Sequence, residues 1–121
     1  MTIEQCYEKL GGDFSRVCRR LPGRGFVERF VQRYLEDDSA RMLLAALQSR
    51  DLEEAFRYAM ALKGVAGNLG FENLERAAAQ LAEALRCTDG GMTPRISALA
   101  EVVRQRQQET VAVLRLYLSE R

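Results

Sequence analysis

The stretch AMALKGVAGNLG, residues 59–70, contains the residues that could take part in chemistry, and they are spaced as on a helix. Lys63 supplies a positive charge that can bind an anion, and Gly64 and Gly67 lack side chains. A glycine inside a helix costs about 1 kcal/mol relative to alanine, so we expect something to approach closely there. The approaching group can belong to a partner protein or to a neighbouring helix of the same chain.

The residue one turn before Gly64 is Met60, whose thioether is neither a base nor a nucleophile toward phosphoryl groups. The chain contains no histidine, which excludes imidazole acid–base chemistry, histidine metal ligands and phosphohistidine. Cys6, Cys18 and Cys87 match neither a disulfide framework nor a CxxC metal pair, so we interpret them as ordinary thiols. We therefore expect no catalytic residue, no metal and no cofactor.

The apolar spacing around this stretch predicts a helix over residues 51–69, capped by Asp51 and closed by Gly70. One side of this helix is expected to face the core, and it carries Leu52, Ala55, Ala59, Leu62, Ala66 and Leu69. The opposite side and its borders are expected to dock a partner, and they carry Phe56, Arg57, Met60, Lys63, Gly64 and Gly67.

Helix caps and apolar spacing divide the rest of the chain into helices, and the small number of prolines and β-branched residues favours an all-α protein. The apolar repeat that begins at Phe26 also includes Val27, Phe30, Val31 and Tyr34. The predicted segments cover residues 2–10, 13–21, 26–34, 41–47, 51–69, 71–86 and 94–120, with Pro22-Gly23 stopping the second. We expect one domain over residues 1–121, an antiparallel four-helix bundle with short additional N-terminal helices.

Charge and hydropathy restrict the classes of partner. The chain has 18 basic and 17 acidic side chains, so no strong field favours nucleic acid or an anionic membrane. The N-terminus does not resemble a signal peptide, and no apolar stretch is long enough to span a bilayer. We expect a cytoplasmic protein with no nucleic-acid or membrane partner.

The longer segment DLEEAFRYAMALKGVAGNLGFENL resembles the signature of histidine-containing phosphotransfer (HPt) domains. In this resemblance the family's phosphoacceptor histidine falls on Met60. The positions that match the family's pattern are Ala59, Leu62, Lys63, Gly64 and Gly70.

The resemblance implies a four-helix bundle in which an exposed histidine receives phosphate from a receiver aspartate. It also implies that Lys63 supplies positive charge near the phosphoryl group and that Gly64 leaves room for the receiver. With Met60 in place of the histidine, we expect a two-component phosphorelay module that is not an enzyme and docks a receiver or histidine kinase without accepting phosphate. The alternatives are a helical scaffold that binds through another face, and an HPt protein whose histidine was substituted.

Overall fold

The computed structural model describes residues 1–21 and 23–120, and these residues form seven α-helices and no strand. None of the described helices is both long and apolar enough to cross a membrane. The helices are α1 (Ile3–Lys9), α2 (Phe14–Arg20), α3 (Arg24–Leu35), α4 (Ser39–Gln48), α5 (Leu52–Asn68), α6 (Glu72–Cys87) and α7 (Pro94–Glu120).

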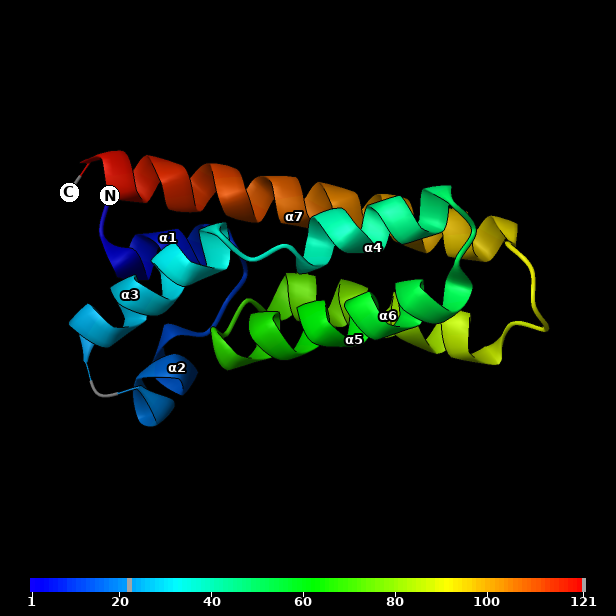
Figure 1. Ribbon diagram of the computed structural model, residues 1–121. Helices are drawn as coiled ribbons and strands as arrows, with labels where there is room; N and C mark the ends of the chain where they lie inside the picture. The colour runs from blue at the N-terminus through cyan, green and yellow to red at the C-terminus, as the bar shows by residue number, and fades with distance from the viewer. Residues whose placement is uncertain (22, 121) are drawn as a thin grey trace.

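Helices α4 to α7 form the bundle, and each runs in the direction opposite to the one before it (Figure 1). Within the bundle α5 packs against both α4 and α6, and α6 packs against α7. The short helices α1, α2 and α3 gather at one end of the bundle, where α1 lies beside the C-terminal part of α7. The predicted all-α antiparallel bundle with additional N-terminal helices is therefore confirmed.

Two of the predicted caps start the helices that matter for the site. Asp13 Oδ1 accepts a hydrogen bond from the amide of Arg16 at 3.0 Å, and Asp51 Oδ1 accepts one from the amide of Glu54 at 3.1 Å. Each bond satisfies one of the amides that a helix start leaves without an intrahelical partner, which is why α2 and α5 begin after these residues. Pro22, predicted to stop α2, lies outside the described residues.

The core stripe of α5 follows the predicted spacing. Leu52, at the first helical position, is only half-buried. The other five predicted residues are at most 4% exposed: Ala55, Ala59, Leu62, Ala66 and Leu69. Three of these five are alanines, so the neighbouring helices α4 and α6 approach α5 closely along this side.

The apolar repeat of α3 is buried only in part. Val27, Val31 and Tyr34 are in the core, but Phe26 and Phe30 are 40% and 37% exposed. The repeat thus marks a helix, but its two phenylalanines remain at the surface. The reason is that α3 lies at the end of the bundle, where only one side of it meets the other helices.

A close contact at Gly70 holds α2 against the turn between α5 and α6. The amide of Asp13 donates to the Gly70 carbonyl at 3.0 Å, and a Cβ on Gly70 would lie 2.4 Å from Val17 Cγ2. Gly70 also has a positive φ of 71°, which an L side chain adopts only with strain. After Gly70, the ring of Phe71 packs against Tyr7 and Tyr34, with centroid distances of 5.4 and 5.3 Å.

Candidate functional site

Met60 and Gly64 lie exposed on successive turns of α5, as predicted. Met60 is 43% exposed, which makes it one of only four large apolar side chains with such exposure among the described residues. A Cβ placed on Gly64 would meet no atom within 4 Å outside the helix itself. Core packing therefore gives no reason for a glycine here, and the space beside it is open to solvent.

A hollow lies beside this exposed part of α5. Its volume is about 310 Å³, and it opens between α5, α2 and the first part of α6. It is lined by Arg16, Arg20, Met60, Lys63, Gly64, Gly67, Asn68 and Glu75. The structure thus brings four of the predicted docking residues, Met60, Lys63, Gly64 and Gly67, to one concave surface.

Gly67 corrects one prediction, because it is buried rather than exposed. The carboxylate of Glu75 covers it, and a Cβ on Gly67 would lie 2.5 Å from Glu75 Oε2. The helical wheel places Gly67 on the same side as Met60, but the short turn after α5 folds the first turns of α6 back over this position. For Gly67, the approaching group belongs to a neighbouring helix of the same chain.

Phe56 and Arg57 lie on α5 before Met60 and do not line the hollow. Phe56 is half-buried and, with Leu85, borders a separate depression near the other end of the bundle. Arg57 is exposed and forms an ion pair with Glu54, with Nη1 3.1 Å from Oε1. These two predicted docking residues therefore flank the Met60 hollow without shaping it.

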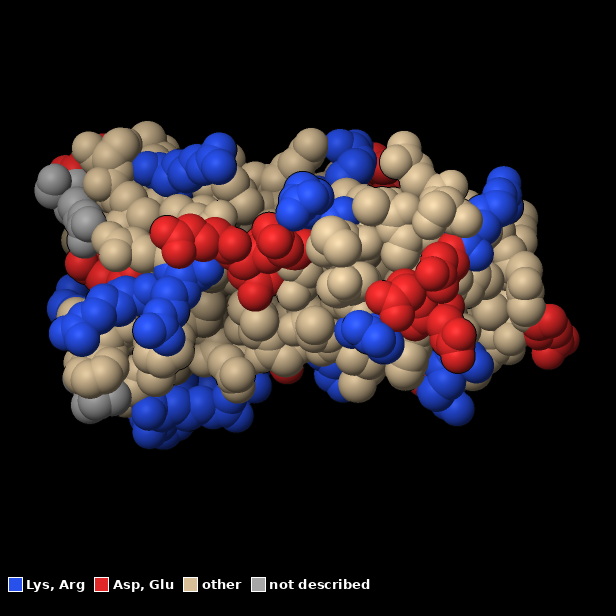
Figure 2. All heavy atoms as spheres, viewed as in Figure 1, with Lys and Arg blue, Asp and Glu red and all other residues tan. Residues whose placement is uncertain are grey.

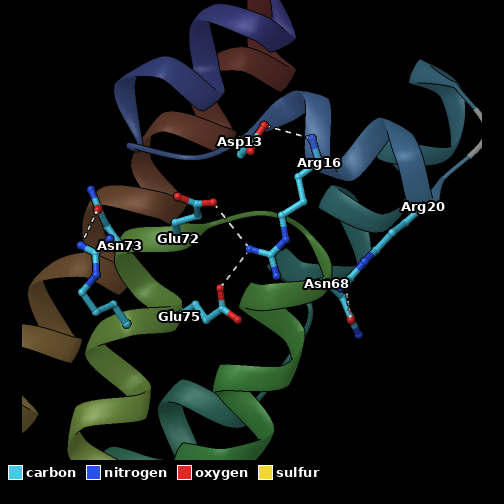
Figure 3. A network of polar contacts seen from close by, with 8 residues as sticks. Asp13, Arg16, Arg20, Asn68, Glu72, Asn73 and Glu75 are labelled. Carbon is cyan, nitrogen blue, oxygen red and sulfur yellow. Dashed lines mark hydrogen bonds and ion pairs between the residues drawn. The ribbon is translucent and has the colours of Figure 1, made fainter.

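Helix α2 contributes two arginines that sequence reasoning did not assign to the site (Figure 3). Arg16 Nη1 lies 3.4 Å from Glu75 Oε1 and 3.6 Å from Glu72 Oε1, which ties α2 to α6. Arg20 Nη1 donates to Asn68 Oδ1 at 3.2 Å, which ties α2 to the end of α5. Their i, i+4 spacing could have shown that they share a helix face, but no local signal places that face against α5.

The hollow presents three cationic side chains and has no imidazole that could accept a phosphoryl group as the family's histidine does. Its cations are two guanidinium groups and one ammonium group, and its exposed apolar side chain is a thioether. The thiol of Cys6 is buried in the core, and Cys18 and Cys87 do not line the hollow. Among the described residues, no three histidine, cysteine, aspartate or glutamate side chains are grouped so that they could hold a metal ion.

Comparison with known proteins gives one family match. The model of the Hpt domain matches residues 27–119, which include the α5 and α6 residues of the hollow. Arg16 and Arg20, on α2, precede the matched region. Neither the curated proteins nor the solved structures gave a significant match to the chain.

Proposed function

Because this chain belongs to the Hpt domain family, whose members are phosphorelay signalling modules, we propose that it docks a receiver domain or a histidine kinase without accepting phosphate. The docking surface consists of Met60, Lys63 and Gly64, which we call the Met60 face, together with the hollow beside it. The module would then occupy or sequester its partner instead of relaying phosphate.

The observation that supports this proposal is that the exposed face around Gly64 is open while the nucleophilic histidine of the family is absent. By the resemblance of the sequence, Met60 takes the position of the family's histidine; its side chain is exposed, and Gly64 one turn later leaves open space beside it. An exposed glycine in mid-helix lowers helix stability by about 1 kcal/mol, so its presence is explained by close approach of a partner. Methionine is flexible and polarisable, and it adapts to the shape of an apolar partner surface.

A binding experiment with receiver domains from the same genome tests the docking surface. Met60→Asp should abolish binding, because it places a charge at the centre of the contact. Leu116→Asp is the matched control, since Leu116 on α7 is 46% exposed but lies away from the hollow. Binding that is lost with Leu116→Asp and kept with Met60→Asp would contradict the Met60 face and support a scaffold that uses another surface.

Restoring the family's nucleophile tests whether only one group is missing. Met60→His places an imidazole with a pKa of about 6.5 on an exposed face, so a neutral nitrogen is available at pH 7 to 8. The exchange should change the free energy of unfolding by less than about 0.5 kcal/mol. The variant should gain acid-labile phosphate from a phosphorylated receiver that binds it, and the starting protein should not. If a bound receiver transfers no phosphate to the variant, the face lacks more than its nucleophile.

A further inference from the structure

A tandem repeat in α3 places aromatic rings and guanidinium groups on one exposed face. The segment FVERFVQR, residues 26–33, consists of FVER followed by FVQR. Because four residues complete slightly more than one helical turn, corresponding residues of the two copies lie on the same side, about 6 Å apart along the axis. The valines of both copies are buried, whereas the phenylalanines and arginines are exposed. We call Phe26, Arg29, Phe30 and Arg33 the Phe–Arg face.

Each arginine of the Phe–Arg face lies over the phenylalanine of its own copy of the repeat. Arg29 Cζ is 4.9 Å from the centroid of the Phe26 ring, and Arg33 Cζ is 5.6 Å from the centroid of the Phe30 ring. Neither arginine forms an ion pair with a carboxylate in the part of the chain that the structure describes. A guanidinium over a ring keeps its full positive charge and its N–H donors, so both groups are available to an anionic partner.

The charge around this face is positive. Helices α2 and α3 together carry six arginines and one glutamate, and two of the arginines, Arg16 and Arg24, form ion pairs with carboxylates of α6 and α1. The glutamate, Glu28, is turned toward α7, where it accepts a hydrogen bond from the Tyr117 hydroxyl. Figure 2 shows Lys and Arg side chains gathered over the end of the molecule formed by α2 and α3. The whole chain has a net charge of only +1, so this positive charge is local.

Two depressions border Phe30 and give the face a shape that side chains of a partner can fill. One has a volume of about 370 Å³ and extends along α3 from Phe26 to Glu36. The other has a volume of about 190 Å³ and lies between α3 and the end of α5, where Val65 borders it. Neither phenylalanine of the face packs against the core, so both rings are free to contact a partner.

We infer that the Phe–Arg face binds an acidic amphipathic helix of a partner protein. Apolar residues at i, i+4 spacing on such a helix recur about every 6 Å, which matches the spacing of the two phenylalanines. Carboxylates beside them would meet the guanidinium groups, whose planar arrangement of donors suits a carboxylate. A phospholipid surface presents its phosphates at no fixed spacing and has no side chains to fill the depressions, so the regular face favours a helix.

This inference goes beyond the proposed function, because it concerns another surface and another class of binding element. None of the four side chains of the Phe–Arg face lines the hollow beside Met60. The two surfaces can therefore be inactivated separately, and each proposal can fail while the other stands.

A designed peptide of about 18 residues, long enough to form a helix on binding, tests the inference. It carries leucines at i, i+4 spacing with glutamates beside them, and a matched peptide has glutamine in place of every glutamate. In an NMR titration of the whole chain, the acidic peptide should produce saturable amide shifts centred on residues 26–33. The glutamine peptide should bind about five- to tenfold more weakly, because two exposed ionic contacts are lost. Equal binding of the two peptides, or shifts centred elsewhere, would overturn the inference.

Single substitutions identify the side chains that bind the peptide. Phe26→Ala should weaken binding by about tenfold, because an apolar anchor is lost, and should leave stability unchanged since the ring lies outside the core. Arg29→Gln should weaken binding by about two- to fivefold, as for one exposed ionic contact. Leu116→Ala and Arg95→Gln make the same kinds of change on α7 and should have no effect. If the α7 variants weaken binding as much as the α3 variants, the Phe–Arg face is refuted.

An exchange of charge tests the complementarity directly. The double variant Arg29→Glu, Arg33→Glu should no longer bind the acidic peptide and should bind a peptide that has lysine in place of each glutamate. Failure to bind the lysine peptide, together with unchanged binding of the acidic one, would show that the arginines do not select the partner. Met60→Asp should leave the affinity for the acidic peptide unchanged, which separates this surface from the Met60 face.

Two other anionic probes decide the class of partner. Vesicles of phosphatidylglycerol and single-stranded DNA both present phosphates that could bind the same arginines. The acidic peptide should bind more tightly than either probe and should displace them from residues 26–33. Tighter binding of the vesicles or of the DNA at these residues would show that the face serves a membrane or a nucleic acid, and the acidic helix would be rejected.

Discussion

At the scale of single residues, the glycines at 64 and 67 are both predicted on the exposed face of α5, but their surroundings differ. Gly64 borders open space, whereas Gly67 lies under the carboxylate of Glu75. Both lack the conformational restriction of alanine, so both lower the stability of α5 by about the same amount. Only Gly64 is therefore free to accept a side chain without moving a neighbour.

Replacing each glycine by alanine should separate these roles. Gly64→Ala should raise the free energy of unfolding by up to about 1 kcal/mol, because it improves helix propensity and meets no atom. Gly67→Ala should gain less, since Glu75 must leave its place beside Arg16. Urea denaturation would measure both changes.

The control for this pair is the same Gly67→Ala change made together with Glu75→Ala. Without the carboxylate, the alanine at residue 67 should recover the full gain in helix stability. If Gly64→Ala and Gly67→Ala stabilise the protein equally in the presence of Glu75, the carboxylate does not hold Gly67, and our account of that position is wrong.

At the scale of helices, contacts with the turn between α5 and α6 fix the position of α2 beside the hollow. The backbone bond from Asp13 to Gly70 and the ion pairs of Arg16 join it to that turn and to α6. Because α2 is short, these few contacts decide whether Arg20 reaches the hollow. The shape of the hollow thus depends on a contact between Asp13 and Gly70, two residues that are far from each other in sequence.

Gly70→Ala should detach α2 from this turn. The new Cβ would lie 2.4 Å from Val17 Cγ2 and 2.8 Å from the Asp13 carbonyl oxygen, in addition to the strain at positive φ. We expect a loss of about 2–4 kcal/mol in the free energy of unfolding, together with faster amide hydrogen exchange in α2.

Gly90→Ala is the matched control for this change. Gly90 also has a positive φ, at 110°, but a Cβ there would meet nothing within 4 Å. It should cost only the backbone strain, about 1–2 kcal/mol, and leave hydrogen exchange in α2 unchanged. Equal losses and equal exchange in the two variants would show that the packing of α2 does not depend on Gly70.

At the scale of the whole molecule, ionisable groups buried in the core determine how stability responds to pH. Burial raises the pKa of Cys6 to about 11, and it also raises the pKa values of Tyr7 and Tyr34. All three residues are neutral acids that the fold keeps protonated. The chain has no histidine, so no imidazole titrates near neutrality.

The free energy of unfolding should therefore be nearly constant from about pH 6 to 8 and fall above about pH 9. A raised acid pKa means that the unfolded chain loses its proton first, so stability decreases as pH rises from the ordinary value toward the raised one. For Cys6 the loss between about pH 9 and 11 should reach about 2–3 kcal/mol. Urea denaturation at a series of pH values would measure it.

The Cys6→Ala variant provides the control for this pH dependence. It should be less stable at neutral pH, because it leaves a cavity in the core, but its stability should fall less steeply between pH 9 and 11. The remaining decrease comes from Tyr7 and Tyr34. An unchanged slope in the variant would show that the Cys6 thiol is not the group responsible.

The sequence alone was enough to predict the helices, the caps at Asp13 and Asp51, and the exposure of Met60. Each of these depends on neighbours within a turn or two of the chain, where periodicity and hydrogen-bonding capacity are sufficient guides. Only the tertiary structure decided that α2 packs at the α5–α6 turn, that its arginines line the hollow, and that Glu75 covers Gly67. Those contacts join residues far apart in sequence, and their geometry follows from how whole helices pack.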